Sequence, residues 1–202
     1  MKDKIAGVLL AGGKSTRMGG TDKCLMELAG QSVLSRVIDR AKGQVGPLVL
    51  NANGNPQRFS SYRLPVVGDV IEGFHGPLAG ILTGLDWAYN NTSGVEYIAT
   101  FPTDSPFFPK DLVDLLYKKI EDGFGLACVR SNGRRHPVFG LWPLGVRTAL
   151  REAIVEEKIR KIDVWTSRYE TGTVDFPTDP IDPFFNLNTP SDFVEAGNFL
   201  KH

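Results

Sequence analysis

Several features that define other classes of protein are scarce in this sequence. Lys plus Arg number 23 and Asp plus Glu also number 23, and this balance argues against a broad electrostatic binder of nucleic acid, which needs a basic excess. Two cysteines, Cys24 and Cys128, are too few for a disulfide framework and cannot form a zinc site alone. No apolar run approaches the roughly 18 residues that a membrane span needs, and the N-terminal residues are not those of a signal peptide. We therefore expect a cytoplasmic protein that binds neither nucleic acid nor membranes.

The distribution of apolar residues predicts a single domain over residues 1–202. A chain of this length with 42% hydrophobic residues can bury a sizeable core. Short apolar runs predict strands at residues 5–10, 45–50, 64–67, 97–101, 125–129, 137–142 and 173–176. Apolar residues at helical spacing predict helices over residues 33–41, 77–89, 110–120, 149–164 and 189–200.

The order of these elements predicts the fold class. Strands that alternate with helices form βαβ units, so we expect an α/β protein with a Rossmann-like three-layer α/β/α sandwich and a mostly parallel sheet. No helix separates the strands at 125–129 and 137–142, and this pair predicts an antiparallel element that makes the sheet mixed. Ligands of such folds bind at the carboxyl ends of the strands, so functional residues are expected directly after each strand.

Glycine and positive charge are concentrated in the loop that follows the first predicted strand. Residues 11–23 fit neither the P-loop pattern nor the dinucleotide-binding pattern G-x-G-x-x-G. The glycines still let backbone N–H groups approach an anion closely, and Lys14, Arg17 and Lys23 supply positive charge. Residues 1–23 contain five basic and two acidic residues, so the neutral chain is positive in this region. The loop predicts a focused phosphate site, with a solvated glycine-rich turn as the alternative.

This loop also resembles that of a known family. From Leu10 to Lys23 it contains L-A-G-G-x-S-x-R-M-G followed by D-K, which is similar to the signature loop of the pyrophosphorylase-type nucleotidyltransferases. The two glycines after Ala11 and the ending G-G-x-D-K are most similar to the molybdenum cofactor guanylyltransferases. Further marks follow in order along nearly the whole chain: N-A-N at 51–53, G-D at 68–69, G-P-L-A-G at 76–80, P-T-D-S-P at 102–106, H-P-V-F-G-L-W at 136–142 and N-L-N-T-P-S-D at 186–192.

The resemblance implies a reaction and its partners. Members of the family have a nucleotide-diphospho-sugar transferase-like fold and transfer GMP from GTP to molybdenum-molybdopterin, which yields the guanine dinucleotide cofactor and pyrophosphate. GTP and molybdenum-molybdopterin are then the substrates, and other molybdenum-cofactor biosynthesis proteins or the recipient molybdoenzyme are candidate partners. The alternative within the enzymes is a molybdopterin cytidylyltransferase or another small nucleotidyltransferase of the same fold. Gly12 favours guanine, because cytidylyltransferase relatives typically carry Ala there and Gly leaves room for a larger base.

The resemblance also implies the residues of the site. Arg17, Lys23 and Asp104 become the catalytic residues, and Asp104 becomes the ligand of a Mg²⁺ cofactor, an ion that prefers oxygen ligands. An Asx-turn or helix cap is the alternative role for Asp104. The implied binding residues are Leu10, Ala11, Gly12, Gly13, Lys14, Lys23, Asn51, Asp69, Gly76, Gly80, Asp104, Asn186 and Asn188.

Several of these residues have plain structural alternatives. Asn51 and Asp69 are also ordinary turn residues, and residues 76–80 are also a typical helix start whose amides could face an anion. The basic cluster at Arg134 and Arg135 could contact the phosphate of the second substrate or be a solvated hairpin. His136, next to Pro137, is expected to be structural rather than a general base.

The chemistry of the implied reaction does not require a nucleophilic side chain. The incoming terminal phosphate of the pterin is already anionic at neutral pH, which agrees with the absence of a recognisable Ser/His/Asp or Cys/His set. What the transfer needs is charge neutralisation and in-line positioning. A non-catalytic nucleotide-binding module is the alternative from another class, and the loop cations together with Asp104 argue against it.

Overall fold

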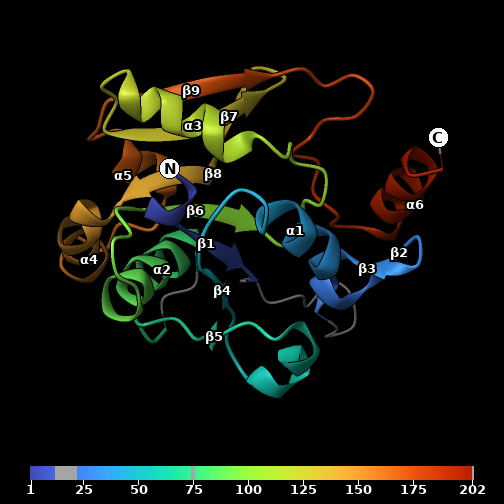
Figure 1. Cartoon of the computed structure of the whole chain (residues 1–202), viewed down its shortest axis with the longest axis horizontal. Helices are drawn as coiled ribbons and strands as arrows, with labels where there is room; N and C mark the ends of the chain where they lie inside the picture. Colours follow the sequence, from blue (N-terminus) through green and yellow to red (C-terminus); the bar gives the residue numbers. More distant parts are fainter. Residues whose placement is uncertain (12–21, 74–75, 202) are drawn as a thin grey trace.

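A seven-stranded mixed sheet forms the centre of the molecule (Figure 1). The computed structural model describes residues 1–11, 22–73 and 76–201. The strand order is β5-β4-β1-β6-β8-β7-β9, and β8 runs antiparallel to both of its neighbours whereas the other pairs are parallel. The strands are β1 (Ile5–Leu10), β4 (Leu48–Asn51), β5 (Val66–Val67), β6 (Tyr97–Pro102), β7 (Leu126–Ser131), β8 (Arg134–Pro143) and β9 (Thr171–Phe176). The expected mostly parallel sheet with one antiparallel element is confirmed.

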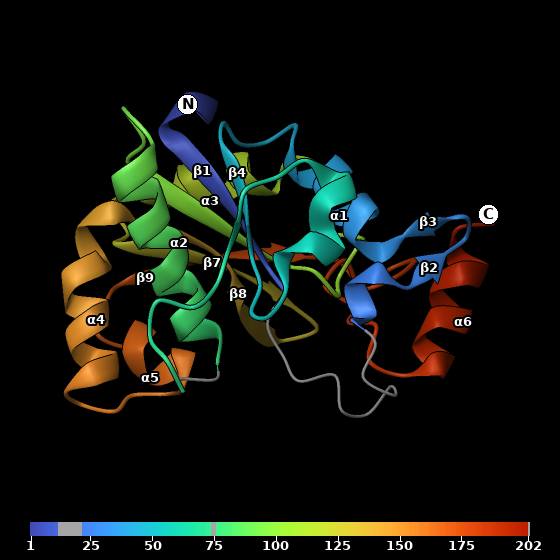
Figure 2. The same cartoon turned by 90° about the horizontal axis from the view of Figure 1, so that it is seen from below.

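Helices cover both faces of the sheet and complete the α/β/α sandwich (Figure 2). The apolar residues of α1 (Val33–Ala41) and α3 (Leu112–Glu121) pack against one face. The other face is covered by α2 (Pro77–Asn91), α4 (Arg147–Val155) and α5 (Ile162–Thr166). The last helix, α6 (Pro190–Phe199), lies away from the sheet in both views and packs against the hairpin of β2 (Glu27–Leu28) and β3 (Gln31–Ser32). Over the described residues, none of the helices has the length and apolar character to cross a bilayer.

Local sequence signals explain where the main elements begin. All six residues of β1 are buried, and a strand covered on both faces carries a continuous apolar run rather than an alternating one. At the start of α1, the backbone N–H of Ser35 donates to Ser32 Oγ over 3.1 Å. At the start of α6, Thr189 and Asp192 form a capping box in which each side chain accepts from the other residue's backbone N–H. The helix predicted over residues 189–200 is therefore confirmed.

The prediction of one continuous helix over residues 149–164 is wrong, because the helix is interrupted in the middle. The structure ends α4 at Val155 and begins α5 at Ile162. Lys158 in between has a φ of 58°, a left-handed conformation that an α-helix cannot continue through. The strand predicted to begin at residue 45 begins instead at Leu48, because Pro47 has no N–H for the ladder.

Some short elements were not predicted at all. The β2–β3 hairpin turns at Ala29 and Gly30, whose φ values of 48° and 79° are typical of a tight two-residue hairpin turn. After β4 comes a 3₁₀ segment, η4 (Pro56–Tyr62), which begins where the side chain of Asn55 accepts from the N–H of Gln57 over 3.0 Å. The remaining 3₁₀ turns are η1 (Lys2–Lys4), η3 (Lys23–Leu25) and η5 (Leu144–Val146).

The topology brings distant parts of the sequence to one edge of the sheet. Leu10 at the end of β1 is in register with Asn51 on one side and with Pro102 on the other. Because β8 is antiparallel, its first residue, Arg134, lies at the same edge as the end of β7 at Ser131. The polar segments that follow the strands therefore meet at the carboxyl edge, where ligands of this architecture bind.

Helix α2 approaches this sheet closely through a glycine. A Cβ on Gly84 would lie 2.5 Å from Val8 Cγ2 of β1, a distance that forces the helix or the strand to move. Gly84→Ala should therefore lower the free energy of unfolding by about 1–3 kcal/mol, the usual cost of overpacking a core. Urea denaturation measures this change.

Gly197 in α6 provides a matched control, because a Cβ there would meet no atom within 4 Å. Gly197→Ala should raise stability by about 0.5–1 kcal/mol through helix propensity alone. Equal effects of the two substitutions would contradict the close approach of α2 to β1.

Candidate functional site

A cavity of about 1090 Å³ opens at the carboxyl edge of the sheet. Every residue that the sequence assigned to the site and that the structure describes lines this cavity: Leu10, Ala11, Lys23, Asn51, Asp69, Gly76, Gly80, Asp104, Asn186 and Asn188. The other assigned residues, Gly12, Gly13, Lys14 and Arg17, lie outside the described residues. The structure therefore brings together residues from seven separate segments of the chain.

One half of the cavity contains a hydrogen-bonded group around Asp69. The buried Asn51 Nδ2 donates to Asp69 Oδ1 over 2.9 Å, and Asn53 Nδ2 donates to Asp69 Oδ2 over 2.8 Å. In return, Asn53 Oδ1 accepts from the backbone N–H of Asp69 over 2.8 Å. These hydrogen bonds join the end of β4 and the turn after it to the segment after β5. Asn51 and Asp69 are therefore not isolated turn residues.

The position of Asn51 depends on a glycine in α2. A Cβ on Gly80 would lie 2.5 Å from Asn51 Oδ1 and 2.8 Å from Leu10 Cδ2. Any side chain at residue 80 would thus displace the Asn51 amide from its contact with Asp69. Gly76 is the N-cap of the same helix, and Gly76, Pro77 and Gly80 border the cavity.

Asp104 lines the cavity just beyond the end of β6. Its backbone carbonyl accepts from the N–H of Leu187 over 2.8 Å, and the neighbouring Ser105 hydroxyl donates to the side-chain oxygen of Asn186. Burial raises the pKa of Asp104, while hydrogen bonds from its own backbone and Ser105 and the charge of Lys23 oppose the rise. The fold thus holds a carboxylate where water solvates it poorly.

Lys23 connects Asp104 to the segment before α6. Its Nζ donates to Asn188 Oδ1 over 3.0 Å, and its charge acts on Asp104. Lys23, Asp104, Asn186 and Asn188 therefore form one polar group, although residues 23 and 188 are far apart in the chain. We call these four residues the Asp104 group.

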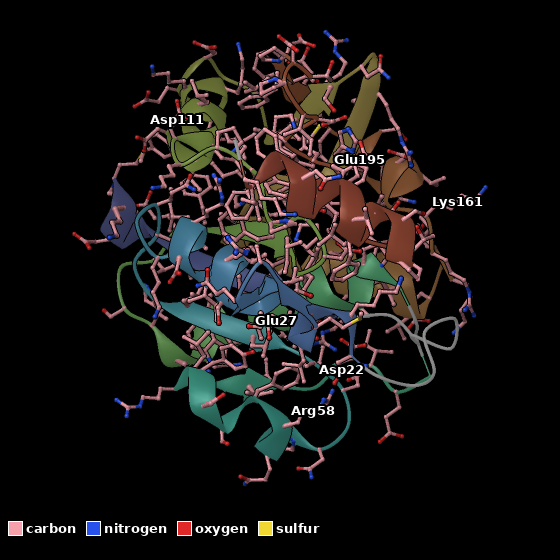
Figure 3. All side chains as sticks on the ribbon, turned by 90° about the vertical axis from the view of Figure 1, so that its right-hand side faces the viewer. Asp22, Glu27, Arg58, Asp111, Lys161 and Glu195 are labelled. Carbon is pink, nitrogen blue, oxygen red and sulfur yellow. The ribbon has the colours of Figure 1, made fainter. Side chains whose placement is uncertain are left out.

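Arg58 is a site residue that sequence reasoning missed. Figure 3 shows Arg58 and Asp22 close together on different segments, and the guanidinium donates to the Asp22 carboxylate. It also donates to the backbone carbonyl of Asn53 over 2.6 Å and to that of Asn55. Arg58 thereby ties the residue before Lys23 to the turn that carries Asn53. No local signal could reveal this role, because η4 itself was not predicted.

The other half of the cavity is formed by the start of β8 and by α5. Arg134, Arg135 and His136 line it together with Ile162 and Asp163. Arg134 and Arg135 are exposed, whereas His136 is only partly exposed. His136 bonds to Ser131 Oγ over 2.8 Å and stacks on Phe184 at 5.3 Å between ring centroids.

The cysteines do not contribute a nucleophile. Cys24 lines the cavity, but burial first and Asp22 second raise the pKa of its thiol to about 11. Burial also raises the pKa of Cys128. Both thiols are therefore protonated at neutral pH, when a nucleophilic cysteine would be a thiolate, and both are buried.

The donor set limits which metal the site could hold. Among the described residues, no group of three or more His, Cys, Asp and Glu side chains could bind an ion by itself. A single carboxylate with amide oxygens nearby suits Mg²⁺, which typically takes one or two carboxylates and completes its shell with phosphate oxygens and water. A cation at Asp104 would also offset the cost of burying that carboxylate.

Comparison with known proteins agrees with this geometry. Residues 7–169 match the MobA-like NTP transferase domain. A molybdenum cofactor guanylyltransferase of Nitrobacter hamburgensis is 49% identical over 191 residues, 94% of this chain and 91% of the relative. One from Rhodopseudomonas palustris strain BisB5 is 48% identical over 190 residues, 94% of this chain and 90% of the relative. The crystal structure of molybdopterin-guanine dinucleotide biosynthesis protein A from Archaeoglobus fulgidus superposes with a TM-score of 0.75 at 21% identity, covering 97% of this chain and 98% of that one.

The fold and the cavity define a Rossmann-like nucleotidyltransferase, an enzyme of the transferase class. More narrowly, the chain belongs to the MobA-like NTP transferase family. The resemblance to molybdenum cofactor guanylyltransferases that the ordered motifs indicated is thus confirmed over most of the chain.

The burial of Asp104 leads to a test that separates function from folding. Because burial raises its pKa, ionised Asp104 makes the folded state less stable at neutral pH than a neutral side chain would. Asp104→Asn removes the carboxylate expected to hold Mg²⁺, so nucleotidyl transfer should fall by at least about 10²-fold. Because the substitution also removes a poorly solvated charge, the thermal midpoint at neutral pH should stay the same or rise. Activity assays and calorimetry on the same sample measure both.

Asp114 offers the control, since it is exposed on α3 and does not line the cavity. Asp114→Asn should leave both the rate and the thermal midpoint nearly unchanged. A marked fall in the melting temperature of Asp104→Asn would instead identify Asp104 as a structural residue.

Proposed function

We propose that this chain transfers GMP from GTP to molybdenum-molybdopterin, which forms the guanine dinucleotide cofactor and releases pyrophosphate. The names of the relatives at 48% and 49% identity support the reaction. The observation that carries the proposal is the arrangement of the cavity, in which two differently built halves meet at the Asp104 group.

The half around Asp69 suits a nucleobase. Guanine has two neighbouring N–H donors on one edge, the ring N1–H and the 2-amino group, and a carboxylate accepts such a pair in a bidentate way. Each Asp69 oxygen already accepts from an asparagine amide, but each carboxylate oxygen has a further lone pair. Cytosine lacks this pair of adjacent donors, so the geometry favours GTP over CTP.

The transfer itself follows from the charges at the junction of the two halves. The phosphate of the incoming substrate is anionic and can attack the α-phosphorus of GTP with pyrophosphate as the leaving group, without a general base. Lys23, together with Lys14, Arg17 and the glycine-rich loop, would neutralise the triphosphate. Asn186 accepts from Ser105 and Asn188 accepts from Lys23, and the family resemblance implies that this pair contacts the second substrate. Positioning and charge neutralisation are sufficient catalysis for such a step.

Mg²⁺ is the proposed cofactor, with Asp104 as its protein ligand. When bound, the ion would neutralise phosphate charge and act as a Lewis acid and template. The partly buried Asp104 carboxylate, whose pKa is raised, supports this role because the fold gains little by burying such a charge for structure alone. Further partner proteins and the cytoplasmic location stay predictions.

A product assay tests the proposal. The protein is incubated with molybdenum-molybdopterin, Mg²⁺ and either GTP or CTP, and the dinucleotide and pyrophosphate are quantified by mass spectrometry and an enzymatic assay. We expect equal amounts of guanine dinucleotide and pyrophosphate, with a rate at least about 10²-fold above that with CTP, since a site that hydrogen-bonds its substrate discriminates strongly.

Asp104→Asn serves as the inactive control in this assay. Faster transfer from CTP would establish the cytidylyltransferase alternative. Binding of GTP without any transfer would contradict the assignment as an enzyme of this reaction.

A further inference from the structure

A hydrogen-bonded chain at the second half of the cavity has no part in the scheme above. Ser131, at the end of β7, donates from Oγ to Asp182 Oδ2 over 2.8 Å. Ser131 Oγ also lies 2.8 Å from His136 Nε2. Asp182 is itself held, because its Oδ1 accepts from the backbone N–H of Phe184 over 2.9 Å. The three side chains therefore link β7, β8 and the segment that leads to Asn186.

The direction of these hydrogen bonds fixes the tautomer of His136. A carboxylate only accepts, so the single hydroxyl proton of Ser131 is used on Asp182. Ser131 Oγ must then accept from His136, which requires that Nε2 carry the proton. In the neutral ring the other nitrogen, Nδ1, is left as a hydrogen-bond acceptor, and within the described residues no side chain or backbone group donates to it.

The surroundings keep this ring neutral and oriented. Burial lowers the pKa of His136, Arg134 lowers it further and Asp182 opposes the shift. The ring stacks on Phe184, which is buried and also contacts Phe139 and Phe176. A neutral ring with its tautomer and plane both fixed has one acceptor, Nδ1, and His136 is among the residues that line the cavity.

We propose that His136 is a specificity-determining residue that accepts a hydrogen bond, through Nδ1, from an N–H group of the second substrate. Ser131 and Asp182 are the positioning residues that hold it in this tautomer. The inference rests on the proposed function, whose second substrate carries a nitrogen heterocycle with ring N–H and amino donors as well as a phosphate. Arg134 and Arg135, which line the cavity with His136, supply positive charge that suits the negatively charged phosphate.

Two substitutions at residue 136 separate the acceptor from the structural contact. His136→Gln can place an amide donor near Ser131 where Nε2 was, but it has no acceptor at the Nδ1 position. His136→Asn places an oxygen near the Nδ1 position and lacks the donor to Ser131. A purely structural histidine would tolerate Gln better than Asn, whereas an acceptor role predicts the reverse.

Steady-state kinetics with molybdenum-molybdopterin and GTP distinguish these cases. For His136→Gln, the KM for molybdenum-molybdopterin should rise about tenfold, the effect of losing one hydrogen bond, while kcat and the KM for GTP change less than about threefold. For His136→Asn, all three constants should stay within about threefold of the wild type. The inference would be overturned if the KM for molybdenum-molybdopterin were unchanged in His136→Gln. It would also be overturned if this KM rose equally in both variants.

Nitrogen NMR of the unliganded wild-type protein tests the tautomer without any assay. The chain has three histidines, so the signals of His136 are identified by their loss in His136→Gln. At neutral pH we expect the Nε2–H tautomer, and an Nδ1–H tautomer would overturn the proposal. If the wild type forms no dinucleotide, the proposed function fails, whereas normal turnover with unaltered kinetics in His136→Gln rejects the role of His136 alone.

Discussion

The pairing of β1 with β4 and β6 is the constraint on which the site depends. Leu10 is opposite Asn51 on one side and Pro102 on the other. The pairing continues past the strands, because Ala11 N–H donates to the carbonyl of Asn51 and Thr103 N–H donates to that of Leu10. A slip of one residue in either pair would turn every side chain of that strand to the opposite face. Close packing of β1 prevents such a slip, because the space at Gly7 beside Leu48 admits no larger side chain and Val8 fits against Gly84 of α2. The register thus fixes the nucleotide half and Asp104 relative to each other.

Polar groups in the cavity are held mainly by one another rather than by secondary structure. Asp69 is bonded by two asparagines, Arg58 ties their turn to Asp22, and Asn188 accepts from Lys23. Such networks are stable only when each member has a partner. Asp104 also has partners, but its burial still makes the charged form unfavourable. Such a cost is common where a fold sacrifices stability for function.

The sequence predicted the sheet and its layers because each strand and most helices carry a consistent apolar pattern. It could not predict the break between α4 and α5, since nothing in residues 156–161 announces the left-handed Lys158. For the site, the family motifs predicted Asn51, Asp69, Asp104 and Asn188, which the fold brings to one cavity. Arg58 and the Ser131–Asp182 pair were not predictable, because their partners are 36 and 51 residues apart in the chain and only the fold brings them together.

In the proposed arrangement, GTP occupies the half of the cavity around Asp69 and the second substrate occupies the half around His136. Photolabelling with 6-thio-GTP, whose photoreactive sulfur lies next to N1–H on the edge proposed to face Asp69, followed by mass spectrometry of the digested protein, tests this arrangement. Label that excess GTP competes away should be attached to residues 51–80 and not to residues 131–142. Competed label on the β7–β8 hairpin would contradict the assignment of the two halves.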